Sequence, residues 1–234
     1  MKVVILAGGL GTRISEETDK GPKPMVLLDD KPILWHLMNI YASQGLDEFI
    51  VAAGYKGEVI HDWVRSLKTP WSIRVFDTGQ DTQTAGRIRL CMNLCPGEPI
   101  MATYGDGLAN VNISSLLALH KSQKRIATVT AVRPPARFGI LKSDAGLVTH
   151  FGEKKQSDAG WINGGFFVFE PAVLDFIQDD SEPFEKGPMS RMVAKSELSA
   201  YLHEGFWQPM DTLREKHDLA KFAEQNPPPW LNLI

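Results

Sequence analysis

The stretch that decides the fold is Lys2-Val3-Val4-Ile5-Leu6-Ala7, which passes directly into Gly8-Gly9-Leu10-Gly11-Thr12-Arg13. A short, uninterrupted apolar run is typical of a parallel strand that is buried on both faces. The glycines that follow it permit backbone conformations and close contacts that other residues exclude. Because ligands of open α/β sheets bind at the carboxyl ends of the strands, this order of residues predicts a ligand-binding loop at the sheet edge.

Strand-like and helix-like segments alternate over the rest of the first half of the chain. The predicted strands are Lys2–Ala7, Glu48–Ala53, Trp71–Phe76 and Pro99–Thr103. The predicted helices are Pro32–Gln44, Gly57–Leu67, Gly86–Leu94 and Ile113–Ser122. Alternation at this spacing predicts βαβ units and a Rossmann-like, doubly wound, mostly parallel sheet.

The second half contains more strands and shorter connections. The predicted strands are Ile126–Val132, Phe138–Lys142, Leu147–Phe151, Trp161–Phe169 and Ser199–His203. Helices are predicted at Pro171–Ile177, Met189–Lys195 and Thr212–Glu224. Prolines 227–229 end the last helix, because proline cannot continue one. We expect a single α/β domain whose sheet becomes mixed in this half.

Composition restricts the class of protein. The chain has 234 residues, of which 43% are hydrophobic and 23% charged, so it can bury a core and is not a disordered chain. The net charge of -3 provides no basic excess for binding nucleic-acid backbone, and we expect no nucleic-acid partner. No apolar run approaches the length of a membrane span, and the N-terminal run is too short for a signal peptide. We therefore expect a cytoplasmic protein without a membrane partner.

The two cysteines, Cys91 and Cys95, do not form a disulfide framework. They are four residues apart, which places them on one side of a helix. No histidine lies nearby to complete a zinc site. We interpret them as small buried apolar side chains.

The glycine loop has the character of a phosphate-binding loop, because its backbone N–H groups can surround phosphate oxygens and Arg13 follows with a guanidinium. It lacks the Gly-Lys-Ser/Thr of a P-loop and the last small residue of the dinucleotide fingerprint. Lys23 stands between Pro22 and Pro24, whose rings restrict its backbone. Such a lysine suits a reacting phosphate, although an exposed lysine in a turn would give the same pattern.

Two aspartates are candidate ligands for Mg²⁺, which takes oxygen ligands and commonly one or two carboxylates. Asp106 lies between Gly105 and Gly107, directly after a predicted strand. Asp211 lies just before the last predicted helix. An N-cap role for Asp211 is an equally good interpretation of the sequence by itself.

Taken in order, these motifs resemble the sugar-1-phosphate nucleotidyltransferases, and among them the glucose-1-phosphate cytidylyltransferases. The resemblance rests on the glycine loop and Pro22-Lys23-Pro24-Met25, and it continues through the segments 31–36, 103–107, 162–168 and 205–214. It covers the chain from Met1 to about Lys216. It implies a reaction in which CTP and a sugar 1-phosphate, expected to be glucose 1-phosphate, give a CDP-sugar and pyrophosphate with the help of Mg²⁺.

The resemblance also implies roles for individual residues. The implied catalytic residues are Arg13, Lys23 and Lys154. Nucleotide binding falls to Leu6, Ala7, Gly8, Gly9, Gly11, Thr12, Arg13, Lys23, Thr84, Gly86, Arg87 and Asp106. Sugar-phosphate binding falls to Tyr104, Gly105, Glu153, Lys154, Asn163 and Gly164. The Mg²⁺ ligands are Asp106 and Asp211. For Thr84 and Arg87 the alternative is an ordinary helix cap followed by a solvated arginine.

This interpretation divides the single domain into a nucleotide-binding half, residues 1–125, a sugar-phosphate-binding half, residues 126–225, and a proline-rich tail, residues 226–234. The segment before Asp77 is shorter than in the cytidylyltransferases, where it contributes contacts near the active site and between subunits. A different acceptor or nucleotide, and assembly with copies of the same chain, therefore stay open. A nucleotide-binding regulatory protein without activity is the alternative from another class.

Overall fold

Strand β1 (Val3–Ala7) lies inside an eight-stranded sheet of the computed structural model, which describes residues 1–9, 11, 18, 21–134, 139–153 and 160–233. The sheet has the order β11-β8-β12-β6-β1-β4-β5, and β13 also pairs with β8. Strands β4, β5 and β6 continue the parallel arrangement around β1. Their bounds are Glu48–Ala53 for β4, Ser72–Asp77 for β5 and Ile100–Tyr104 for β6.

The second half of the chain adds mixed pairing, as its short connections predict. Strand β12 (Phe167–Phe169) is antiparallel to both β6 and β8 (Ala127–Val132). Strand β13 (Leu198–His203) is parallel to β8. The expected doubly wound, mostly parallel sheet with a mixed second half is therefore confirmed.

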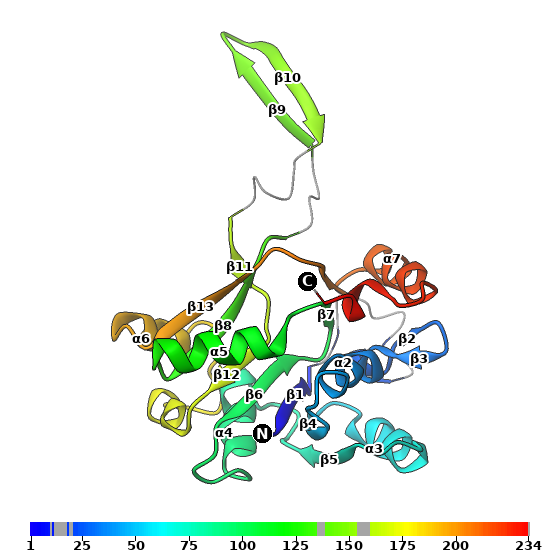
Figure 1. The fold of residues 1–234 in the computed structure, drawn as a ribbon, viewed down its shortest axis with the longest axis vertical. Helices are drawn as coiled ribbons and strands as arrows, with labels where there is room; N and C mark the ends of the chain where they lie inside the picture. Colours follow the sequence, from blue (N-terminus) through cyan, green and yellow to red (C-terminus); the bar gives the residue numbers. More distant parts are fainter. Residues whose placement is uncertain (10, 12–17, 19–20, 135–138, 154–159, 234) are drawn as a thin grey trace.

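Helices cover both faces of the sheet (Figure 1). One face packs against α2 (Ile33–Ala42), α3 (Gly57–Ser66), α5 (Ile113–Gln123) and α7 (Leu213–Ala223). The other packs against α4 (Thr84–Met92), the 3-10 helix η4 (Pro171–Phe176) and α6 (Pro188–Ala194). The helix predicted over Pro171–Ile177 is present as η4 and is of the tighter 3-10 type.

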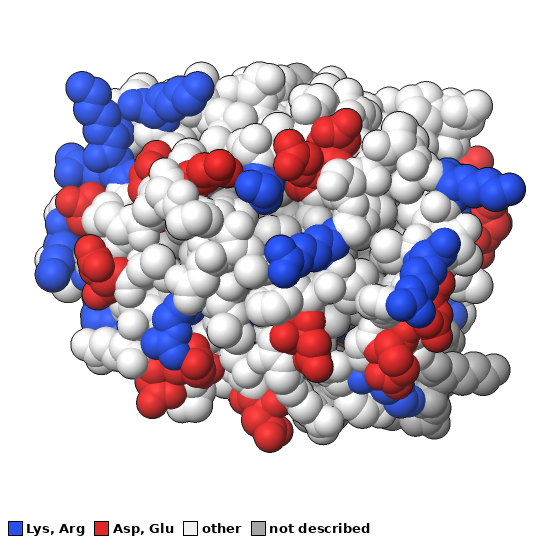
Figure 2. Space-filling view, turned by 90° about the horizontal axis from the view of Figure 1, so that it is seen from below, with Lys and Arg blue, Asp and Glu red and all other residues white. Residues whose placement is uncertain are grey.

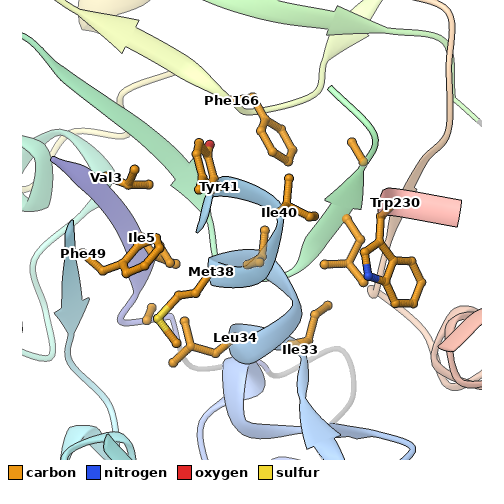
Figure 3. Close-up of a cluster of buried hydrophobic side chains, with 14 of the residues drawn as sticks. Val3, Ile5, Ile33, Leu34, Met38, Ile40, Tyr41, Phe49, Phe166 and Trp230 are labelled. Atoms are coloured by element: carbon orange, nitrogen blue, oxygen red, sulfur yellow. The ribbon is translucent and has the colours of Figure 1, made fainter. Parts of the chain in front are cut away.

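Alternation along β1 assigns its side chains to two cores. Val3, Ile5 and Ala7 belong to the cluster under α2, whereas Val4 and Leu6 belong to the cluster under α4. Figure 3 shows α2 in the first cluster, with its apolar side chains directed toward those of β1, Phe166 and Trp230. Burial on both faces explains why β1 is apolar throughout.

The predicted continuous strand over 161–169 was wrong. The segment forms β11 (Ile162–Asn163) and β12, separated by a turn in which Gly165 and Phe166 have φ angles of 79° and 47°. Both strands pair with the same edge of β8. Strand β11 pairs with Val132 and Ala131 at the carboxyl end of β8, and β12 pairs with Thr128 and Ala127 at its amino end, so the turn carries the chain along this edge.

Three short antiparallel pairs lie outside the main sheet. They are β2 (Leu27–Leu28) with β3 (Lys31–Pro32), β7 (Gly107–Ala109) with β14 (Trp207–Pro209), and β9 (Gly139–Asp144) with β10 (Leu147–Glu153). Figure 1 shows the β9–β10 hairpin projecting away from the layered body. The described residues also form the η2 turn (Lys23–Met25) and η5 (Pro229–Leu231).

Two surface properties follow from the described residues. None of their helices is long and apolar enough to cross a membrane. On the face shown in Figure 2, acidic and basic side chains are interspersed, in keeping with the small net charge.

The cysteines are buried as predicted, with Cys91 and Cys95 at 0% and 2% exposed.

Candidate functional site

A cleft of about 490 Å³ opens at the carboxyl ends of β1 and β6. The strand order reverses here, because β4 follows on one side of β1 and β6 pairs on the other, which is where ligands bind in such sheets. Twelve residues predicted for the site line this cleft. They are Leu6, Ala7, Gly8, Gly9, Gly11, Lys23, Thr84, Arg87, Tyr104, Gly105, Asp106 and Asp211.

The glycine loop is held against its neighbours by Arg87, which comes from α4. Its guanidinium donates to the carbonyl oxygens of Gly8 and Ala53, each at 3.1 Å, to that of Gln80 at 3.3 Å, and to the hydroxyl of Thr78. Arg87 is only 4% exposed, so the alternative of a solvated arginine is wrong. Burial lowers the pKa of Arg87, and nearby Asp77 acts in the opposite direction. Arg87 borders the cleft, but its donors are used by the protein itself.

Gly8 is required by this contact. A side-chain carbon at Gly8 would overlap the Arg87 guanidinium, and one at Gly54 would lie 2.7 Å from it. The arginine therefore occupies space that any larger residue at either position would take. The absence of a side chain at Gly8 is a consequence of packing as well as of access to a ligand.

The other end of the cleft contains a lysine between two carboxylates. Lys23 Nζ lies 2.7 Å from Asp106 Oδ2 and 2.9 Å from Asp211 Oδ1. Lys23 is 9% exposed, so the alternative of an exposed lysine in a turn is wrong. Burial by itself would lower the pKa of Lys23, but the two carboxylates outweigh it and raise this pKa. The ammonium is therefore firmly charged.

Gly105 allows Lys23 to approach the sheet. The Gly105 N–H donates to the Leu6 carbonyl at 3.0 Å, and a side-chain carbon at Gly105 would lie 2.9 Å from that oxygen and from Pro24. The ends of β1 and β6 and the turn at 22–25 therefore meet at a glycine. This close approach places Lys23 beside Asp106.

Pairing of β7 with β14 brings the two aspartates together. Pro209 pairs with Gly107, and the Met210 N–H donates to the Asp106 carbonyl at 2.8 Å. Asp211 does not cap α7, because Thr212 is the N-cap and its hydroxyl accepts from the Glu215 N–H at 3.2 Å. The alternative of an Asp211 cap is therefore wrong, and Asp211 instead lines the cleft with its carboxylate bonded to Lys23.

The donor chemistry of this pair suits a hard divalent cation. Carboxylates from Asp106 and Asp211 converge on one ammonium, and Mg²⁺ in phosphate-transfer sites takes one or two carboxylates together with substrate phosphates. Among the residues that the structure describes, no group of three or more His, Cys, Asp or Glu side chains could hold a metal by itself. The pair thus fits a cation that also binds phosphate.

A chain of hydrogen bonds runs along the side of the cleft between the two halves of the sheet. Asn163 Nδ2 donates to the Tyr104 hydroxyl at 2.9 Å, and Tyr104 donates to Glu185 Oε1 at 2.5 Å. Thr84 donates to Glu185 Oε2 at 3.1 Å. Burial, and then the charge of Glu185, raise the pKa of the Tyr104 phenol well above its ordinary value.

Some of the predicted residues are placed differently or are not described. Thr12, Arg13 and Lys154 lie outside the described residues, and Glu153 is described only as the last residue of strand β10. Gly86, Asn163 and Gly164 are not among the residues that line the cleft, although Asn163 is bonded to Tyr104, which is. Gly86 packs against the Asp180 backbone, and Gly164 packs against Val132. Gly86 and Gly164 were assigned to the site because of the resemblance to the family, but both pack against other parts of the protein and do not face the cleft.

Several residues at the cleft were not predicted from the sequence. The segment 80–83 contributes four lining residues, and Pro24 another. Glu185 was also missed, because it lies in the connection 183–187, which carries no periodic pattern and no motif. Segment 80–83 could have been suspected of binding a ligand, because it is polar and comes shortly after the carboxyl end of β5.

Comparison with known proteins gives relatives over the whole length of the chain. The profile of the nucleotidyl transferase family matches residues 2–225. Glucose-1-phosphate cytidylyltransferases of Salmonella typhi and Salmonella typhimurium are each 42% identical over 253 aligned positions, which cover 98% of this chain and 98% of each relative. The solved structure of HddC from Yersinia pseudotuberculosis has a TM-score of 0.74 at 22% identity, covers 94% of this chain and 98% of its own, and agrees in fold.

Proposed function

The chain belongs to the nucleotidyl transferase family, and from this membership we propose that it joins CTP and glucose 1-phosphate to give CDP-glucose and pyrophosphate. The observation that carries the proposal is 42% identity with cytidylyltransferases over almost the whole of both chains. The cleft supports it, because a glycine loop, a charged lysine and two carboxylates surround one space.

The reaction is an attack of a sugar phosphate oxygen on the α-phosphorus of CTP. A new oxygen–phosphorus bond forms, the bond from the α-phosphorus to the oxygen that bridges to the β-phosphate breaks, and pyrophosphate leaves with that electron pair. A phosphate monoester has its second pKa near about 6, so the nucleophile is already ionised at neutral pH. The protein needs no general base and must instead position and neutralise charge.

The glycine loop and Lys23 perform this task on the nucleotide side. Backbone N–H groups of the loop bind triphosphate oxygens, with Arg87 holding the loop from behind. Lys23 binds phosphate at the point where the two substrates meet, since its ammonium lines the cleft. From the sequence we add Arg13 for the triphosphate and Lys154 for the sugar phosphate.

Asp106 and Asp211 are the residues that would hold Mg²⁺. A bound cation would neutralise the charge that develops on the leaving pyrophosphate and would orient the triphosphate. The two aspartates come from separate segments joined by the β7–β14 pair, so their separation is set by the fold. Lys23 balances their charges in the protein described here.

From the sequence we add Tyr104, Asn163 and Glu153 as the residues that would bind the sugar. Asn163 is joined to Tyr104, and Tyr104 lines the cleft. Glu153 and Asn163 belong to the proposed sugar-phosphate-binding half, residues 126–225, whereas Tyr104 comes from the proposed nucleotide-binding half, residues 1–125. We further propose that the enzyme works in the cytoplasm, where CTP is available.

A pyrophosphate-release assay tests the proposal. Purified protein is incubated with Mg²⁺, each nucleoside triphosphate in turn, and a panel of sugar 1-phosphates. We expect release with CTP and glucose 1-phosphate, and mass spectrometry should find CDP-glucose. No release with any pair would favour the alternative of a nucleotide-binding protein without activity, which binding of CTP measured by calorimetry would then identify.

A second candidate keeps the reaction class but changes the acceptor or the nucleotide. The alignment with the cytidylyltransferases spans 253 positions, whereas this chain has 234 residues, so the relatives carry residues that it lacks. Between α3 and β5 the chain has only residues 67–71. A short connection here leaves room for a different acceptor, and the same assay would reveal it as release with another sugar 1-phosphate.

A further inference from the structure

Glu185 joins the two sides of the cleft although it does not line the cleft itself. Its carboxylate accepts from the Tyr104 hydroxyl at 2.5 Å and from the Thr84 hydroxyl at 3.1 Å. Thr84 and Tyr104 both line the cleft, one at the start of α4 and the other at the end of β6. The next residue in the chain of bonds, Asn163, comes from the second half of the protein.

An ionised carboxylate sets the direction of every bond in this chain, because it can only accept hydrogen bonds. The Tyr104 proton must point to Glu185, so the phenolic oxygen must accept from Asn163 Nδ2. The carbonyl oxygen of the same Asn163 amide accepts from the Gly165 N–H at 2.9 Å. The orientation of the amide is therefore fixed. Asn163 does not line the cleft itself but is bonded to Tyr104, which does, and its amide has a second N–H and a second acceptor position that a ligand hydroxyl could use.

Thr84 is held in the same way. Its hydroxyl donates to Glu185 and accepts from the Phe184 N–H at 2.7 Å. Phe184, through its backbone N–H, and Glu185, through its carboxylate, are therefore both bonded to Thr84 at the start of α4. Movement of Glu185 would affect the nucleotide side through Thr84 and the sugar side through Tyr104.

We propose that Glu185 is a positioning residue that orients Asn163 through Tyr104 for a sugar hydroxyl, and so contributes to recognition of the acceptor. This assignment rests on the proposed function for the identity of the acceptor. The orientation of Asn163 itself rests on its bond to Tyr104, on the bond from Tyr104 to Glu185, and on the bond that its carbonyl oxygen accepts from the Gly165 N–H.

Glu185→Gln tests the assignment, since glutamine has the same shape but can donate through its amide and no longer sets the direction of the bonds. We expect the KM for glucose 1-phosphate to rise about tenfold, with kcat and the KM for CTP within about threefold of the wild type. Tyr104→Phe should have the same effect, and the double variant should be no worse than either single one. The exposed Asp175→Asn, which loses the same charge, is the matched control.

A second readout does not depend on turnover. The side-chain amide resonance of Asn163, assigned by its loss in Asn163→Ala, should shift in Glu185→Gln and in Tyr104→Phe but not in Asp175→Asn. An unchanged resonance, or effects of Glu185→Gln and Tyr104→Phe on KM that multiply in the double variant, would overturn the role of Glu185. A wild type that releases no pyrophosphate from any pair would instead overturn the proposed function, and the resonance would still decide whether Glu185 orients Asn163.

Discussion

The two ends of the cleft each contain a buried cation, but the two cations have different partners. Arg87 donates to three backbone carbonyls and a hydroxyl, all of them neutral. Lys23 binds two carboxylates, whose side chains are 34% and 28% exposed. One cation therefore organises backbone, and the other belongs to a group of charges that is open to a ligand.

This difference separates the roles of the two residues. Arg87 joins the carbonyl of Gly8 in the glycine loop to the Ala53 carbonyl at the end of β4 and to the Gln80 carbonyl, so the arginine acts as a brace between these segments. The acceptors of Lys23 are also the candidate ligands of a metal, and its ammonium is equally suited to phosphate. We therefore expect changes at Lys23 to affect turnover most, and changes at Arg87 to affect binding and stability.

The largest effect is expected for Lys23→Met. Loss of a preorganised charge at the reacting phosphates should lower kcat by about a thousandfold, since electrostatic groups of this kind contribute about that much. Loss of the ammonium between the two carboxylates should lower the free energy of unfolding by only about 1–3 kcal/mol, because both are partly exposed to solvent. Steady-state kinetics and urea denaturation measure the two effects, with exposed Lys121→Met as control. A kcat close to that of the wild type would remove Lys23 from the mechanism.

The next largest effects compare Asp211, which binds Lys23, with its neighbour Thr212. Asp211→Asn should lower kcat/KM about a hundredfold and leave the free energy of unfolding within about 1 kcal/mol of the wild type. Thr212→Ala removes the cap of α7 and should cost about 1 kcal/mol without changing turnover per folded molecule. Kinetics over a range of Mg²⁺ concentrations and thermal unfolding measure both. If Asp211→Asn unfolds the protein while activity per folded molecule survives, Asp211 has a structural role.

Arg87 is tested by two changes on opposite sides of one contact. Arg87→Lys removes the fork that serves several acceptors and should lower the free energy of unfolding by about 2–4 kcal/mol. Gly8→Ala forces the arginine away from the loop and should raise the KM for CTP about tenfold or more, with a smaller change in kcat. Exposed Arg125→Lys is the control. If Arg87→Lys weakens CTP binding at unchanged stability, then Arg87 contacts phosphate directly and is not a brace.

The smallest effect concerns pH and lies away from the cleft. Burial lowers the pKa of His36 and of His203 below the ordinary value of 6.5, although each donates to a backbone carbonyl. The unfolded chain thus takes up protons at these positions before the folded chain does. Stability is complete above pH 6.5 and falls as the pH drops below it, by at most about 1.4 kcal/mol per pH unit for each histidine.

Urea denaturation at pH 7.5 and pH 5.5 measures this loss. His203→Gln, which keeps an N–H donor for the Phe206 carbonyl but does not titrate, should reduce the difference between the two pH values. A difference that is as large in the variant as in the wild type would assign the pH dependence to other groups.

Most of the fold could be predicted from local pattern. The strand β4 was predicted with the bounds that the structure has, and β1, β5 and β6 to within one residue. Strands β1, β4 and β6 are largely buried and therefore apolar, whereas β5 lies at the edge of the sheet and alternates between exposed and partly buried residues. The break between β11 and β12 and the short β7–β14 pair were not predicted. Both depend on partners far away in the sequence rather than on a repeating pattern.

The candidate site divides in the same way. The sequence by itself determined that a glycine loop ends β1 and that Asp106 follows a strand at the same edge, because strand direction and chain order place these ends together. Only the tertiary structure decided that Lys23 binds aspartates 83 and 188 residues away, that Thr212 rather than Asp211 caps α7, and that Arg87 faces backbone. A periodic pattern records which face of an element is buried, whereas the partner of a buried charge depends on which distant segments the fold brings to the same point.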